Sequence, residues 1–424
     1  MSAKTVVFFP EGAFGPTNNC VGIGEQLRDR GHRVVFIVEE SFAGTLAARG
    51  FEEQLMRLGP PPEVEEAPGQ FWKDFIRDTA PVFRKPTIEQ LGEFIQPTWQ
   101  ALLDGSRYVQ PRLIEIFGEL RPDVIVEDNV PGFPAVVTAE APWVRIVSCN
   151  PLELPDPDLP PVFSGYPVAD RGGWAAFHAE YERTHRSMWD EFNGWVQEQG
   201  APPLPDLQFI HTADVNMYLY PAEADYARRV PLGDDWHRLD SCVRRPESEF
   251  EVPEQLREGD GALIYLSLGS LASADVALME RLVEVLGQTR HRFIVSRGPQ
   301  ADLYELAGNM WGEEFLPQPA ILPQVDLVIT HAGNNTTTEC FHHGKPMIAM
   351  PVFWDQYDNA QRIDEAGFGV RLDTYAFEPG DMTSAIDRLL ADGALRDRLA
   401  AMGSRLQASP GTVKAADLIE RLAS

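Results

Sequence analysis

Short apolar runs alternate with amphipathic helical segments along most of this chain. Buried-strand patterns occur at residues 5–10, 33–38, 124–126, 143–148, 214–219, 262–268, 292–296, 326–330 and 346–350. Helical periodicity predicts helices between them, among them residues 21–30, 87–120 (broken at Pro97 and Pro111), 174–200, 275–288 and 412–422. A surface loop rich in proline and glutamate is expected at 58–69. Alternating strands and helices are typical of parallel sheets with helices on both faces.

The chain of 424 residues is too long for one ordinary hydrophobic core. The pattern predicts two doubly wound α/β domains, at residues 1–233 and 261–408. A polar stretch with charges and scattered prolines, residues 234–260, is expected to link them. The last residues, 409–424, are expected to form a helix that packs back on the first domain.

Composition and charge exclude several classes of partner. The net charge of −28 argues against nucleic acid and against anionic membrane surfaces. No apolar run has the length of a membrane span, and the N-terminus lacks the regions of a signal peptide. The four cysteines are far apart and lack the spacing of zinc or redox motifs. We therefore expect a cytoplasmic protein with reduced thiols and no metal.

A polar turn follows the strand at 326–330 and runs from His331 to Thr338, and a helix pattern begins at Glu339. In a parallel sheet such a turn lies at the carboxyl edge of the strands, where ligands bind. The free N–H groups of a helix N-terminus favour an anion there, typically phosphate. The turn is not the dinucleotide fingerprint, and the chain lacks the P-loop pattern, so neither NAD binding nor ATP hydrolysis is favoured.

The first half of the chain differs in character from this turn. It contains many prolines, and the helical segment 174–200 carries six aromatic side chains at helical spacing. These aromatic residues fit either a packed core or a wall of an apolar ligand cavity. The residues alone therefore indicate a two-domain enzyme that joins a nucleotide-linked group to an apolar partner.

An ordered series of motifs in the second half resembles the nucleotide-sugar signature of family-one glycosyltransferases, which include bacterial macrolide and natural-product enzymes. The matching positions are Phe315, Pro317-Gln318, Ile321-Leu322, Thr330-His331-Ala332-Gly333, Asn335-Thr336, Glu339, Gly344-Lys345-Pro346, Asp355-Gln356 and Asn359. The resemblance implies a GT-B fold with a cleft between the domains, no metal or cofactor, and inverting transfer from a UDP-sugar co-substrate to an apolar small-molecule acceptor, as in antibiotic glycosylation.

The resemblance also implies a role for individual residues. Gln318 is expected to hydrogen-bond the base, beside a stacking face at Phe315 or Trp311. The diphosphate is expected at His331, with Gly333, Asn335 and Thr336 in the same turn and Ser270 in the opposite one. Glu339 would accept hydrogen bonds from the ribose hydroxyls. Asp355 and Gln356 would hold the sugar, which Trp354 flanks, and this pair makes glucose the first expectation.

One position departs from the family pattern. The catalytic histidine of the family, in the loop after the first strand, corresponds here to Pro16, which can neither accept nor donate a proton. The aspartate that orients that histidine has a match in Asp128. Asp128 or Glu11 is therefore a candidate for the general base, which is worth about 10²–10⁴ in rate.

A carboxylate base has three alternatives that the residues leave open. In the first, the loop differs in length from that of the family and another residue serves as the base. In the second, catalysis needs an auxiliary protein. In the third, the chain binds a nucleotide sugar without transferring it. The sequence leaves the sugar, the acceptor and the oligomeric state undecided.

Overall fold

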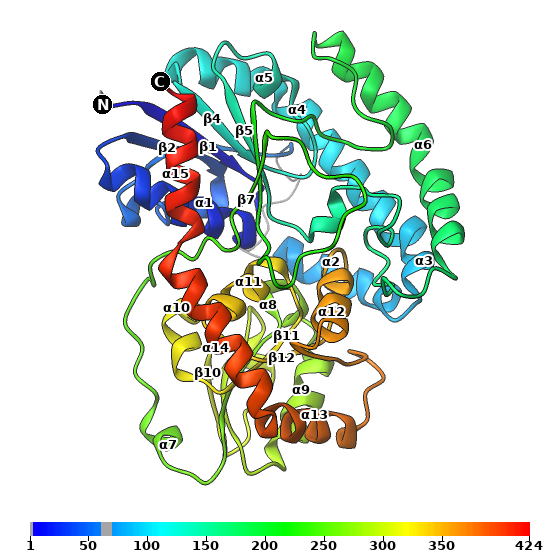
Figure 1. The fold of residues 1–424 in the computed structure, drawn as a ribbon, viewed down its shortest axis with the longest axis vertical. Coiled ribbons are helices and arrows are strands. Elements are labelled where there is room, and N and C mark those ends of the chain that lie inside the picture. Colours follow the sequence, from blue (N-terminus) through cyan, green and yellow to red (C-terminus); the bar gives the residue numbers. More distant parts are fainter. Residues whose placement is uncertain (1–2, 61–69) are drawn as a thin grey trace.

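The computed structural model describes residues 3–60 and 70–424, and it contains two domains, each built on a parallel β-sheet (Figure 1). The expected surface loop at 58–69 falls mostly on residues outside the described ones. The two-domain α/β prediction is confirmed.

The first sheet has seven strands, all parallel: β1 (Thr5–Pro10), β2 (Arg33–Glu39), β3 (Glu52–Met56), β4 (Val124–Asp128), β5 (Trp143–Val147), β6 (Val215–Tyr218) and β7 (Trp236–Arg238). Their spatial order is β3-β2-β1-β4-β5-β6-β7. The second sheet has six: β8 (Leu263–Ser267), β9 (Arg292–Ser296), β10 (Met310–Glu313), β11 (Leu327–Thr330), β12 (Met347–Ala349) and β13 (Gly369–Arg371). Their order is β10-β9-β8-β11-β12-β13, again all parallel.

Helices cover both sheets. In the first half they are α1 (Phe14–Asp29), α2 (Gln70–Phe83), α3 (Thr87–Gln90), α4 (Gln96–Leu120), α5 (Pro134–Val137) and α6 (Trp174–Glu198). In the second half they are α7 (Glu254–Arg257), α8 (Gly269–Ala272), α9 (Val276–Gly287), α10 (Gln318–Ile321), α11 (Asn334–His342), α12 (Gln356–Glu365), α13 (Pro379–Ala391), α14 (Gly393–Ala408) and α15 (Gly411–Leu422).

The central strands are buried along their whole length. All residues of β4, β8 and β11 are buried, as expected for strands that have helices on both faces. Because the strands are parallel, their carboxyl ends meet at one edge of each sheet. In both domains the turns after these ends lie near the boundary between the domains, which is where ligands bind in such folds.

Three details differ from the sequence expectations. Helix α1 begins at Phe14, seven residues before the helix expected at 21–30. Pro16 fits there because the N–H groups of a first helical turn have no partner within the helix. Helix α4 continues through Pro111 instead of breaking. Strand β7 pairs with β6, so the first sheet ends later than the expected boundary at 233.

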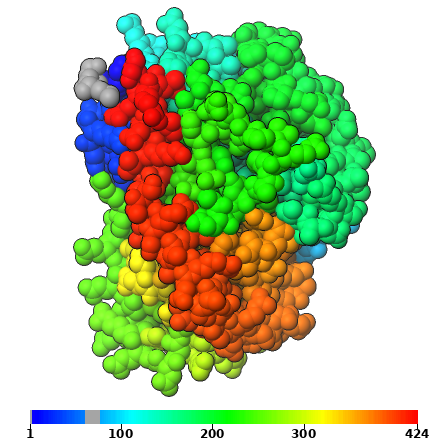
Figure 2. All heavy atoms as spheres, viewed as in Figure 1, coloured from blue at the N-terminus to red at the C-terminus, as the bar shows by residue number. Residues whose placement is uncertain are grey.

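Helix α15 returns to the first domain, where it lies beside α1 (Figure 1). Ala415, Ala416 and Ile419 belong to the hydrophobic cluster of β1, β2 and α1. On the same helix, Glu420 lies 2.8 Å from the Nε2 of His32. In the space-filling view, α14 and α15 form a continuous band across both domains (Figure 2).

Helix α12 carries much of the hydrogen bonding between the domains. The Asp358 carboxylate accepts the backbone N–H groups of Phe163 at 2.6 Å and Gly165 at 2.8 Å. The Asp355 carboxylate accepts the N–H of Asn150 at 2.8 Å. These contacts hold the carboxyl edges of the two sheets face to face.

The position of α15 leads to a stability prediction. Replacing the buried Ile419 by alanine should lower the free energy of unfolding by about 2–5 kcal/mol, because a cavity forms in the first-domain core. Asp417→Ala on the exposed face is the control, with an expected change of about 0–1 kcal/mol. Urea denaturation of both variants measures the difference, and equal effects would contradict the packing described here.

Candidate active site

The turn between β11 and α11 exposes the start of a helix to the domain boundary. Ala332 has a left-handed backbone, with φ of 63°. Gly333 is the N-cap of α11, and no side chain hydrogen-bonds to the first turn. The helix sequence, rich in asparagine and threonine, has a low intrinsic helix propensity, so burial of the helix holds it in place. The N–H groups of its first turn remain able to bind an anion.

His331 lies between two glycines from different turns. A Cβ on Gly269 would lie 2.8 Å from the Nε2 of His331, and one on Gly333 would lie 2.5 Å from the same atom. Both glycines therefore make room for the imidazole. Burial lowers the pKa of His331 to about 4, so the ring is neutral at physiological pH. Ser270, the next residue after Gly269, is half-buried at the start of α8.

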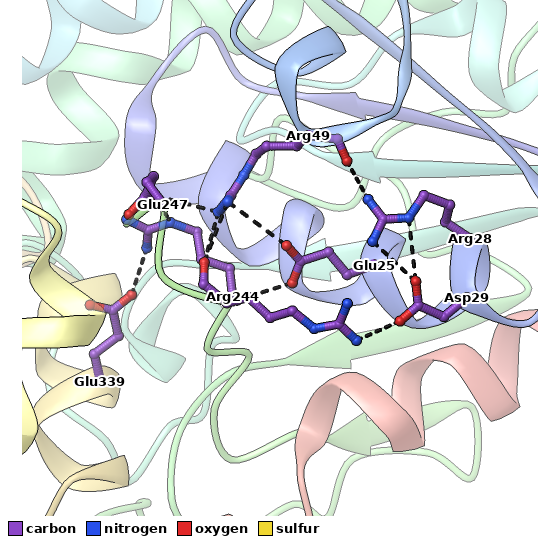
Figure 3. Close-up of polar contacts among 8 residues, drawn as sticks. Glu25, Arg28, Asp29, Arg49, Arg244, Glu247 and Glu339 are labelled. Atoms are coloured by element: carbon purple, nitrogen blue, oxygen red, sulfur yellow. Dashed lines mark hydrogen bonds and ion pairs between the residues drawn. The ribbon is translucent and has the colours of Figure 1, made fainter. Parts of the chain in front are cut away.

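Glu339 is the centre of a buried polar network in α11. Its Oε1 accepts hydrogen bonds from the Arg244 Nη1 at 2.9 Å and from the Asn335 Nδ2 at 3.2 Å. Its Oε2 accepts one from the Gln318 Nε2 at 2.6 Å. Figure 3 shows the pair of Arg244 and Glu339 at one end of a chain of ionic contacts. Three of the expected donor-binding residues therefore contact one another.

Gln318 also approaches Thr336, with 3.3 Å between Nε2 and Oγ1. Phe315 is 60% exposed, and its ring centroid lies 6.3 Å from that of Phe14 in the first domain. Trp311, the other expected stacking residue, packs against Phe250 instead. Of the two, Phe315 therefore offers the exposed aromatic face.

The residues expected to hold the sugar lie at the start of α12. Trp354 has a left-handed backbone, with φ of 56°, and its ring lies 4.6 Å from Phe163 and 5.5 Å from Trp99 between centroids. Burial raises the pKa of Asp355 to about 7, and the N–H of Asn150 opposes this rise. The Gln356 Oε1 accepts the backbone N–H of Val352 at 3.0 Å.

The two expected catalytic carboxyls are neighbours. Asp128 ends β4 and is 2% exposed, and its backbone carbonyl accepts the N–H of Glu11 at 2.8 Å. Burial raises the pKa of Asp128 to about 8, and a hydrogen bond from Ser148 opposes the rise. Burial, together with the charges of Glu153 and Asp355, raises the pKa of Glu11 to about 7. Glu11 therefore lies close to the second domain.

Pro16 lies in the first turn of α1, and the neighbouring Gly15 approaches Asn335, with 3.8 Å between its ideal Cβ and the Asn335 Cβ. The N-termini of α1 and α11 therefore face each other across the domain boundary. A hydrogen-bond chain runs behind them, from the Asn19 Nδ2 to the Ser148 Oγ at 3.0 Å, and from there to Asp128 at 2.6 Å.

Sequence reasoning missed several groups at this site. Arg244 falls in the segment expected to be a linker, and Glu153 falls in an irregular stretch rich in proline. The Glu153 carboxylate pairs with the Arg145 guanidinium at 2.8 Å. A pairing between residues far apart in the chain leaves no periodic signal, so only the fold could show the contact of Arg244 with Glu339.

Two features bear on partners. Within residues 3–60 and 70–424, no helix combines the length and apolar character that crossing a membrane requires. In the same described part of the chain, no group of three or more histidine, cysteine, aspartate or glutamate side chains is arranged to hold a metal ion.

Comparisons with known proteins agree with the fold. The sequence profile described as "UDP-glucoronosyl and UDP-glucosyl transferase" matches residues 182–409. The chain is 26% identical to the oleandomycin glycosyltransferase of Streptomyces antibioticus, over 98% of this chain and 90% of that protein. The crystal structure of the glycotransferase of kitacinnamycin is similar with a TM-score of 0.71, 21% identity and complete coverage of both chains. A glycosyltransferase in complex with dTDP has a TM-score of 0.66 and 17% identity, with 99% of each chain covered.

The glycine beside His331 leads to a second stability prediction. Gly269→Ala should destabilise the protein by more than about 1 kcal/mol, because Gly269 has φ of +69° and its Cβ would press on the imidazole. Gly380→Ala, in a helix with open space around it, is the matched control and should be neutral or slightly stabilising. Thermal denaturation of both variants is the measurement; a Gly269→Ala protein as stable as the control would show that the turn is not constrained.

Proposed function

The chain belongs to the family of UDP-glucuronosyl and UDP-glucosyl transferases, and we propose that it transfers a sugar, with inversion, from a nucleoside diphosphate sugar to a hydroxyl of an apolar natural product. The observation that carries this proposal is the arrangement after β11. There, an uncapped helix N-terminus, a neutral histidine held between two glycines, and the network of Glu339 lie in one turn-and-helix unit.

The diphosphate fits this turn for a physical reason. The leaving group gains negative charge as the bond to the sugar breaks, and donors aimed at that charge stabilise the transition state most. The first-turn N–H groups of α11 and the neutral His331 supply such donors without a metal. The opposite turn, which contains Gly269, also lies against the His331 ring. Ser270 follows Gly269 in that turn and is the expected further contact of the diphosphate.

The base, ribose and sugar are assigned to neighbouring groups. Phe315 offers an exposed ring for stacking, and Gln318, three residues further on, is hydrogen-bonded to Glu339. Asp355 and Gln356, with Trp354 next to them, are the candidates for holding the sugar. Glucose is the first candidate sugar. UDP and dTDP are both candidate carriers, since one protein of similar fold is in complex with dTDP.

We assign the general base to the pair of Glu11 and Asp128. One carboxylate accepts the proton of the acceptor hydroxyl, whose oxygen attacks the anomeric carbon. The bond from that carbon to the phosphate oxygen breaks, and the nucleoside diphosphate leaves with its electron pair. Glu11 is half-buried whereas Asp128 is 2% exposed, so an acceptor hydroxyl reaches Glu11 more easily and Glu11 is the first candidate. Asp128 is the more deeply buried of the two and accepts a hydrogen bond from the Ser148 hydroxyl.

The direct test of this function is product formation. Purified protein is incubated with UDP-glucose or dTDP-glucose and a panel of phenols and macrolides, and release of the nucleotide and product mass are followed. We expect a glycoside with inverted anomeric configuration. Tight nucleotide binding without product, even with candidate auxiliary proteins added, would instead support a nucleotide-sugar binder, one of the alternatives that Pro16 leaves open.

The carboxyl pair predicts the pH dependence. Below about pH 7 both groups hold their protons and cannot accept another, so kcat/KM should rise with pH up to about 8. Glu11→Gln should lower kcat about 10²–10⁴-fold and leave nucleotide affinity unchanged. Asp128→Asn is measured beside it, and the variant that loses the acid limb of the profile identifies the base. An unchanged profile in both variants would exclude the pair.

A further inference from the structure

Glu339 has little capacity left to accept hydrogen bonds. An ionised carboxylate offers about four acceptor positions, two on each oxygen. The Oε1 of Glu339 already accepts from Arg244 and Asn335, and the Oε2 accepts from Gln318. About one position therefore remains. A ribose presents two neighbouring hydroxyls, whereas a 2′-deoxyribose presents one.

Among the hydrogen-bond donors to Glu339, Arg244 is the one that a ligand cannot easily displace. Its side chain is 8% exposed and Glu339 is 2% exposed, so their ion pair is buried. A neutral hydroxyl that replaced the guanidinium would leave a buried charge without its partner, which costs more than one neutral hydrogen bond returns. Gln318 is half-buried and neutral, and its hydrogen bond leaves one acceptor position on the Glu339 Oε2 for a ligand hydroxyl.

The segment around Arg244 is itself fixed in place. The Arg244 Nε donates to the Glu247 Oε1 at 2.7 Å, and Glu247 also lies 3.4 Å from Arg49. The backbone N–H of Arg245 donates to the Glu25 Oε2 at 3.0 Å. Figure 3 shows these contacts as one network that joins α1 to Glu339 in the second domain. The guanidinium therefore meets Glu339 from a tethered segment.

We propose that Arg244 is a specificity-determining residue of the nucleotide site. Arg244 takes the acceptor position of the Glu339 Oε1 that Asn335 leaves free, so a ribose 2′-hydroxyl has no acceptor there and the site gains nothing from that hydroxyl. A 2′-deoxyribonucleoside diphosphate sugar is then bound at least as well as its ribonucleotide counterpart. This inference rests on the proposed function, which places the nucleotide sugar beside Glu339.

The test compares UDP with dUDP, which differ only in the 2′-hydroxyl, by calorimetry on the full chain. The wild-type protein should bind the two with a Kd ratio near one. Arg244→Met frees one acceptor position on the Oε1, which keeps its hydrogen bond from Asn335, so UDP should become favoured by about two- to tenfold, the equivalent of one net neutral hydrogen bond. Arg245→Met, in the same segment but paired with Asp29 instead of Glu339, is the matched control and should keep the wild-type ratio.

Each outcome supports or overturns the role of Arg244. A wild-type preference of about tenfold or more for UDP overturns the inference, and this measurement needs no variant to fold. If a folded Arg244→Met protein keeps the wild-type ratio of the Kd values for UDP and dUDP, the inference is also overturned. The Arg244→Lys variant keeps a cation beside Glu339, so a ratio near one supports the role of the ion pair. If neither nucleotide binds, the proposed function fails together with the inference.

Discussion

The relative position of the two domains depends on two buried carboxylates at the start of α12. Asp355 and Asp358 accept backbone N–H groups from the first domain, and burial raises the pKa of both. A buried polar group without a partner is costly, so these backbone bonds resist separation of the domains. They also bring Asp355 close enough to Glu11 to raise its pKa. The proposed acceptor and donor halves of the site are thus joined through the same short helix.

Electrostatics at the site are local, as the overall charge of −28 requires. A diphosphate would meet a strongly acidic protein, and His331 beside it is uncharged. Arg244, a buried cation of the site, is committed to Glu339 and Glu247. Attraction for the phosphates must then come largely from oriented backbone dipoles at the start of α11, which act at short range and are insensitive to the net charge.

The sequence predicted the local structure of the proposed donor side better than that of the proposed acceptor side. The turn after β11 is continuous in the chain, so its residue spacing predicts both the strand–turn–helix and the neighbours of His331. The proposed acceptor side combines Glu11, Asp128 and Ser148, which follow or end three different strands, with Asp355 in the other domain. No local pattern encodes such distances. The start of α1 was also mispredicted, because Pro16 and Gly15 look like loop residues yet are tolerated in a first helical turn.

The return of α15 to the first domain has a mechanical consequence. The chain passes between the domains once before α7 and again between α14 and α15, so the first domain contains elements from both sides of the second, among them β1 and α15 (Figure 1). The second domain is topologically an insertion, held at two points instead of one. Two covalent connections oppose twisting of one domain about the other. The motion that they restrain least is rotation about the line that joins the two connections. Opening of the boundary between the domains would then be a hinge rotation about this single axis.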